Sequence, residues 1–214
     1  MAFGTLYLPK GFTLRFDQRI KSVNWSVNNV VFDDGATIDL SASDPKPPRA
    51  HDGASRTGQQ GYCTPGDGGD PGGDGVDGTP GIDLTITNVG PLTSSGTLWI
   101  KTDGGPGGDG GNGGNGQTGG GPRSTGEGLF HGGSCGGAGG GPGGRGGKGG
   151  AGGRPGKVTI LFAVPGAVPP TNEVATVCGP TTRPTMMPAG SMIIAGAAGC
   201  GGQSGNNGRS GGHG

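Results

Sequence analysis

The chain has 214 residues, of which 58 are glycine and 18 are proline, and only 28% are hydrophobic. This apolar fraction is too small for an ordinary packed core, and abundant glycine excludes a mainly helical protein because each glycine costs an α-helix about 1 kcal/mol relative to alanine. The formal net charge is zero, so bulk charge gives no reason to expect nucleic acid or an acidic membrane surface as a partner. The sequence also predicts no secretory signal and no membrane insertion.

Residues 1–43 predict a small N-terminal β cap with a modest core. Short strands are expected at residues 5–8, 13–16, 27–32 and 37–41. Phe12, Leu14 and Phe16 alternate with polar residues, which is the period-two pattern of a half-buried strand. Trp25 adds apolar surface to the same region.

Residues 44–164 form the glycine-rich body of the chain. Residues 44–65 indicate a loop-like connection, because Pro45, Pro47 and Pro48 disfavour regular secondary structure. Glycine then recurs at every third position from 66 to 81, and it fills two of every three positions over most of 104–116 and 143–153. Strands are expected between these tracts, at residues 82–88, 97–102 and 157–164.

The period of three predicts polyproline II geometry, a left-handed helix with 3 residues per turn and a rise of about 3.1 Å. A line of glycine along such a helix leaves a groove into which another backbone fits. Collagen needs one glycine line, whereas the dense tracts carry two, so we expect polyglycine II helices bundled side by side and hydrogen-bonded laterally. The predicted fold class is mainly irregular and β, a polyglycine II bundle with short strands and essentially no α-helix.

The C-terminal part is expected to be an arm and a tail. Residues 165–191 predict a proline-rich extended linker, which spans on the order of 80 Å when fully extended. Residues 192–214 form a Gly-X-X tail that needs a partner groove, and we expect this groove in a neighbouring subunit rather than in its own. The assembly residues would be the glycine line Gly196, Gly199, Gly202, Gly205, Gly208 and Gly211.

The four cysteines favour two disulfides. None has the CxxC spacing of a zinc site, and a core-poor extracellular protein commonly depends on cross-links. Four cysteines allow three pairings, among which the sequence does not choose. The disulfide candidates are Cys63, Cys135, Cys178 and Cys200.

Two groups of charged residues lie on the glycine tracts. An acidic group is a weak candidate for calcium, which carboxylate oxygens bind, although its spacing does not fit an EF-hand and a solvated acidic edge is the simpler interpretation. A basic group on and just after the later tract offers an edge of opposite sign that could pair between subunits, although exposed ion pairs contribute little singly, about 0–1 kcal/mol. The acidic residues are Asp67, Asp70, Asp74 and Asp77, and the basic ones are Arg145, Lys148, Arg154 and Lys157.

No catalytic or cofactor-binding residues are predicted. Gly132, Ser134 and Gly136 formally match a GxSxG motif beside His131, but such a match is expected by chance in a glycine-rich chain and lacks the strand-turn-helix context of a nucleophile elbow. We therefore expect a protein that is not an enzyme and has no cofactor.

Residues 66–81, 104–156 and 196–214 resemble, in period and composition, the glycine-rich adhesins at the tips of T-even-like phage long tail fibres and the bacterial collagen-like Gly-X-X proteins. The phage family implies a rigid sandwich of polyglycine II helices whose connecting loops bind a surface receptor. The comparable loop here is 122–134, with Leu129, Phe130 and His131 as its receptor residues. Glycine-rich antifreeze proteins share the period, but they present flat faces of small residues, unlike the Asp, Asn, Arg and Lys found here.

These observations give two functional expectations. The first is a structural subunit of a self-assembling extracellular fibre or sheath, with the tail docked on a neighbouring subunit and the protein itself as its partner. The alternative is a receptor-binding adhesin like a phage tail-fibre tip, with a cell-surface receptor as partner. Either protein would work outside the cell or on a virion surface.

Overall fold

The computed structural model describes residues 1–90, 93–94, 96–124, 134–162, 171–174, 178 and 192–214. These residues contain ten β-strands and no α-helix, and the remainder is irregular by backbone pattern. The mainly irregular and β class expected from the sequence is therefore confirmed for the described part of the chain.

The first sheet is parallel throughout. Its strands follow the order β1 (Ala2–Leu8), β3 (Ser22–Phe32), β5 (Asp83–Val89) and β8 (Val158–Phe162), and β6 (Thr93–Ser94) also pairs with β3. Partners far apart in sequence lie in register, such as Leu84 with Val158. The sheet is thus built from widely separated parts of the chain.

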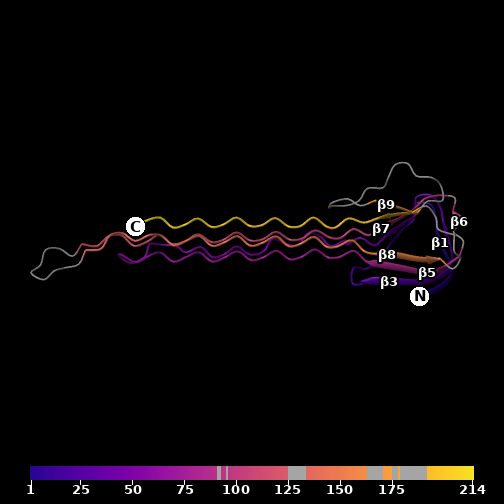
Figure 1. The fold of residues 1–214 in the computed structure, drawn as a ribbon, viewed down its shortest axis with the longest axis horizontal. Helices are drawn as coiled ribbons and strands as arrows, with labels where there is room; N and C mark the ends of the chain where they lie inside the picture. The colour runs from indigo at the N-terminus through magenta and orange to yellow at the C-terminus, as the bar shows by residue number, and fades with distance from the viewer. Residues whose placement is uncertain (91–92, 95, 125–133, 163–170, 175–177, 179–191) are drawn as a thin grey trace, which may run out of the picture. The chain divides into compact units, whose positions relative to one another are not determined.

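The second sheet is also parallel. Its order is β2 (Thr13–Arg15), β4 (Thr37–Asp39), β7 (Leu98–Lys101), β10 (Met192–Ala195) and β9 (Thr171–Val174). Parallel strands require long crossover connections, which are usually α-helices. Here the connections from β4 to β5 and from β7 to β8 consist largely of glycine-rich segments (Figure 1).

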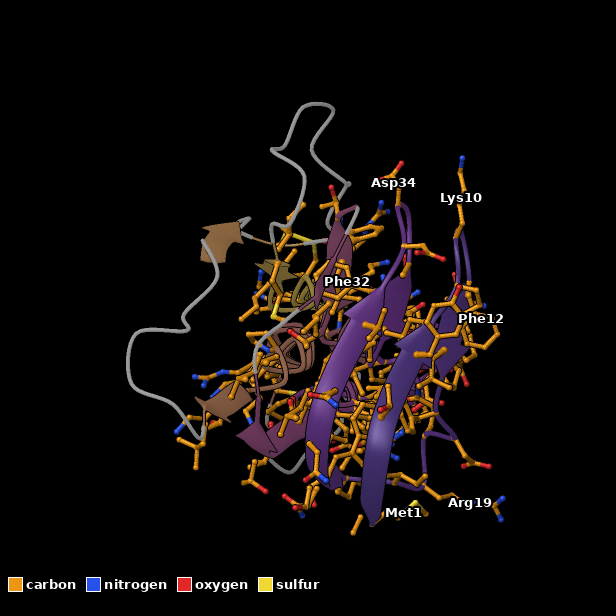
Figure 2. All side chains as sticks on the ribbon, turned by 90° about the vertical axis from the view of Figure 1, so that its right-hand side faces the viewer. Met1, Lys10, Phe12, Arg19, Phe32 and Asp34 are labelled. Atoms are coloured by element: carbon orange, nitrogen blue, oxygen red, sulfur yellow. A yellow bond between two sulfur atoms is a disulfide. The ribbon has the colours of Figure 1, made fainter. Side chains whose placement is uncertain are left out.

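The core follows from strand alternation. In β3, Val23, Trp25 and Val27 are buried, and the alternation then slips by one so that Val30 and Phe32 are buried. Figure 2 shows Phe32 at the end of β3, and Phe12 on the turn before β2. Phe32 is fully buried whereas Phe12 remains 44% exposed, so the core depends on strand residues rather than on the turn.

The chain divides into two compact units, each assembled from three stretches. Unit one comprises Met1–Lys46, Gly78–Pro106 and Ala151–Cys200, and unit two comprises Pro47–Asp77, Gly107–Gly150 and Gly201–Gly214. The strands expected in residues 1–43 are present as β1 to β4, but they do not form a separate cap. Each of them pairs with strands from later in the chain or lies in a sheet with such strands, because a parallel sheet needs distant partners.

The expected linker, residues 165–191, falls mostly outside the described residues. Its described part includes β9, which pairs with β10. The expected tail, residues 192–214, begins with β10 itself, where Met192 and Ile193 are buried.

Candidate interaction surface

Unit two contains five segments that run side by side, four of them glycine-rich (Figure 1). We number them I (residues 47–60), II (64–77), III (107–121), IV (137–150) and V (201–214). Their registers show that I, III and V are parallel to one another and antiparallel to II and IV. Segment I was expected to be a loop, yet its proline-rich start is compatible with extended backbone that hydrogen-bonds laterally.

Segment III is the central segment, because its amides reach neighbours on several sides. Gly111 N donates to Gly73 O of segment II at 2.9 Å, and Gly110 N donates to Gln203 O of segment V at 2.8 Å. Gly147 N of segment IV donates to Gly111 O at 2.8 Å. Each of these contacts recurs at every third residue along the segments. A repeat of three residues therefore governs the lateral bonds.

The glycine lines are required by close backbone approach. A Cβ built on Gly147 would lie 2.5 Å from the carbonyl carbon of Gly73, closer than real Cβ atoms come, and one built on Gly205 would clash in the same way with the carbonyl group of Gly111. Positive φ is not the reason, since among the described glycines only Gly11, Gly35 and Gly58 have it. Glycine thus serves packing here rather than conformational freedom.

The polar positions between the glycines serve a purpose that the sequence analysis missed. Their side-chain oxygens accept hydrogen bonds from backbone amides of the adjacent segment, which face no carbonyl. Asn112 Oδ1 accepts from Asn206 N at 2.9 Å, and Asp52 Oδ1 accepts from Asn112 N at 2.7 Å. The same contact is made by Asp109 to Gln203 N, Asn115 to Arg209 N, Ser55 to Asn115 N, Asp74 to Lys148 N and Asn207 to Gly146 N.

Three of the four aspartates considered for calcium accept hydrogen bonds from nitrogen donors. Asp67 Oδ2 accepts from Gln60 Nε2 at 3.1 Å, and Asp70 pairs with Arg56 at 2.8 Å. Asp74 Oδ1 accepts from the Lys148 amide at 2.7 Å, and Asp77 also has an interaction partner. Across the described part of the chain, no group of three or more potential metal ligands comes together.

The expected assembly glycines lie against the same chain. Gly202, Gly205, Gly208 and Gly211 donate to carbonyls of segment IV at 2.8 Å, and Gly199 does the same to Gly153 within unit one. A Cβ on Gly196 would meet the Thr102 hydroxyl. The sequence predicts that this tail docks on a neighbouring subunit. In the structure it completes the bundle of its own chain, because the grooves there have the same three-residue spacing as its glycine line.

All four cysteines form disulfides, as expected. Cys63 pairs with Cys135, with Cα atoms 6.0 Å apart, and Cys178 pairs with Cys200 at 4.9 Å. Two disulfides are typical of proteins that fold in an oxidising compartment. The sequence had left three pairings open.

The Cys63–Cys135 disulfide lies at the base of the connection between segments III and IV. Arg123 and Cys135 exchange two backbone hydrogen bonds at 3.2 and 3.1 Å, and Cys63 N donates to Gly121 O at 3.0 Å. The Arg123 guanidinium lies 5.8 Å from the ring centre of Tyr62, which is 67% exposed. The predicted receptor residues Leu129, Phe130 and His131 fall outside the described residues.

The basic residue Arg154 is paired within the chain, not left for another subunit. Its Nη1 and Nη2 atoms bind the two carboxylate oxygens of Asp83 at 2.8 and 2.9 Å, and Lys157 N donates to Asp83 Oδ1 at 2.8 Å. The Arg154 hydrogen bonds, followed by the Lys157 amide, lower the pKa of Asp83 from 3.8 to about 2. Both contacts stabilise the ionised carboxylate.

We expect this site to make folding stability pH-dependent. Because the pKa of Asp83 is lowered on folding from 3.8 to about 2, its contribution is fully present above 3.8 and is lost as the pH falls toward 2. The side chain is 34% exposed, so solvent screening limits the contribution to about 1 kcal/mol. Denaturant unfolding of Asp83→Asn should show this loss at neutral pH and a much smaller difference from wild type near pH 2, where the folded-state carboxyl is itself becoming protonated.

A control is available in Asp17, which binds Arg19 at an exposed site where the side chains are 50% and 90% accessible. Asp17→Asn should change stability less than Asp83→Asn at neutral pH. An Asp83→Asn variant as stable as wild type from neutral to acid pH would contradict the role assigned to this carboxylate.

The described residues contain no helix long and apolar enough to cross a membrane. No protein-family model matches the sequence, and no curated protein matches it. One solved structure with a match is described as a springtail antifreeze protein from Granisotoma rainieri, a bundle of nine polyproline type II helices whose crystal waters match the ice lattice; it is 22% identical over 58% of this chain and 95% of its own. The TM-score is 0.09, so this likeness bears on neither the fold nor the function of the present chain.

Proposed function

We propose that the protein is a non-enzymatic structural subunit of a self-assembling fibre or sheath, located outside the cell or on a virion surface. In this proposal segments II to V are polyglycine II helices and segment I is a polyproline II helix beside them, and together they make the subunit rigid. The main support is the lateral bonding in unit two, which recurs every third residue as the three-residue turn of this helix requires.

Rigidity follows from how completely the central segment is bonded. From Gly110 to Gln117, every backbone amide of segment III donates to a carbonyl of segment II or V or to a side chain of segment I. Opening such a segment would break bonds to several neighbours together. Chain entropy lost by glycine on folding is offset by this dense bonding.

Negative-stain microscopy of the purified, oxidised protein tests this proposal. We expect filaments or sheets whose abundance increases with protein concentration. Monodisperse monomers at every salt and protein concentration would overturn the proposal.

A receptor-binding adhesin is the second candidate. It is supported by the closed base of the connection 122–134, where the Cys63–Cys135 disulfide and the paired Arg123 and Cys135 backbones hold the two ends together. Such a base fixes the two ends of the connection relative to each other.

Replacing Leu129, Phe130 and His131 with serine distinguishes the two functions. An adhesin would lose binding to its target cells, whereas a fibre subunit would assemble as the wild type does. Cell binding that survives the triple replacement would contradict the adhesin.

A further inference from the structure

Segments I, III and V form a row that is held together by one repeated bonding rule. Ala50 N of segment I donates to Asp109 O of segment III at 2.9 Å, and Gly110 N of segment III donates to Gln203 O of segment V at 2.8 Å. In both cases the donating amide belongs to the residue that follows a polar residue, and the accepting carbonyl belongs to a polar residue. The rule repeats for Gly53 to Asn112, Arg56 to Asn115, Gly113 to Asn206 and Gly116 to Arg209.

The side chains obey the same rule in the same direction. Asp52 of segment I accepts from Asn112 N of segment III, and Asn112 in turn accepts from Asn206 N of segment V. Each segment therefore offers the next one two sets of groups. One is a line of backbone amides that donate to its carbonyls, and the other is a line of side-chain oxygens that accept from its amides. Because all three segments are parallel, a further parallel segment beyond V would be bonded by the same rule.

The two edges of this row are complementary. On segment V, the amides that would donate to a further segment by this rule are those of Ser204, Asn207 and Ser210. All three residues are exposed, and their amides have no hydrogen-bond partner among the described residues. On segment I, the matching acceptors are the main-chain carbonyls of the exposed residues Arg49, Asp52 and Ser55, which likewise accept nothing from the described part of the chain. Donor edge and acceptor edge have the same three-residue spacing.

We propose that segment V of one copy docks beside segment I of a second copy, parallel to it, and so continues the row from subunit to subunit. The interface joins two different surfaces, so it leaves a donor edge and an acceptor edge free after each addition. It is the counterpart of strand addition at an open sheet edge. This inference rests on the proposed function, because it names the contact through which the subunits assemble.

Proline substitution on segment V tests the contact without disturbing the segment itself. Proline removes an amide donor and suits extended polyproline II backbone, so Ser204→Pro/Ser210→Pro deletes two of the three outward donors and leaves the lateral bonds of Gly202, Gly205, Gly208 and Gly211 in place. We expect the concentration needed for assembly, measured by sedimentation velocity, to rise about tenfold or more. The thermal unfolding midpoint should stay at the wild-type value.

Arg145→Pro is the matched control. Arg145 is an exposed residue of segment IV, three positions after Pro142, and its amide also has no bonding partner in the described chain. This variant should assemble as the wild type does, since segment IV is not part of the row. Loss of assembly in both variants would overturn the inference, because the effect would then not be specific to the row.

A second variant keeps the test valid if proline disturbs folding. Ser204→Lys/Ser210→Lys retains both amides but places two long side chains between segment V and segment I of the next copy, so the concentration needed for assembly should again rise. Assembly of both double variants at wild-type concentrations would overturn this contact while leaving the fibre proposal intact. A wild-type protein that never assembles would overturn both.

Discussion

Replacing Gly147 with alanine is expected to lower the free energy of unfolding by about 2–3 kcal/mol. The new methyl group would lie 2.5 Å from the carbonyl carbon of Gly73 and 3.1 Å from the amide of Asp74. Both are backbone atoms of segment II, where the amides of Gly73 and Gly75 on either side make lateral bonds, so relief requires that the segments separate. Urea unfolding of wild type and variant measures the loss.

Gly139→Ala is the control for this prediction. An alanine Cβ at residue 139 would meet only the His213 ring, at 3.7 Å, which is ordinary van der Waals contact. Neither glycine has positive φ, so the alanine backbone is unstrained at both positions. Gly139→Ala should leave stability unchanged or raise it by about 0.4–1 kcal/mol. Equal destabilisation by both variants would show that close backbone approach is not what selects glycine.

Removing the Cys63–Cys135 disulfide by a double replacement with serine is expected to cost about 2–4 kcal/mol of stability. This disulfide joins residues 72 positions apart, and it closes the base at which segment IV begins. Without this cross-link the unfolded chain has more conformational entropy, which lowers the free energy of unfolding. Denaturant unfolding under oxidising conditions measures the change.

The second disulfide provides a built-in comparison. Cys178 and Cys200 are 22 positions apart, so chain entropy predicts a loss about 1 kcal/mol smaller for the corresponding double serine variant. A larger loss from the shorter loop would contradict the entropic account and point to contacts of the disulfide itself.

The sequence predicted the absence of α-helix and seven of the ten strands in the described residues, because the signals of these strands are periodic. It did not predict β6, β9 and β10, the last two of which lie in the expected linker and tail. The alternation of Phe12, Leu14 and Phe16 marks β2, and the glycine lines mark segments II to V. Segment I differs from the loop expected for residues 44–65, because its prolines disfavour helix and strand but suit extended polyproline II backbone. The available signal for segment I was the pair of small residues Ala50 and Gly53, three positions apart, whose amides donate to segment III.

The partners of the periodic segments were harder to predict. A glycine line fits any groove with the same spacing, so Gly202 and Gly205 carry no information about whether segment IV of the same chain or of another is their acceptor. The polar positions suffered from a related ambiguity. The sequence does not distinguish Asn112 and Asp52 from solvated surface residues, because the backbone amides that their side chains bind lie on other segments.

The parallel sheets have a consequence for the rate at which the chain folds. Leu98 pairs with Met192, and Leu84 with Val158, so strand neighbours are brought together across dozens of intervening residues. Closing such loops loses entropy before any pairing compensates for it, which makes non-local topologies slow to fold. We expect refolding in milliseconds to seconds or slower, with the glycine-rich crossovers, not local helices, setting the barrier.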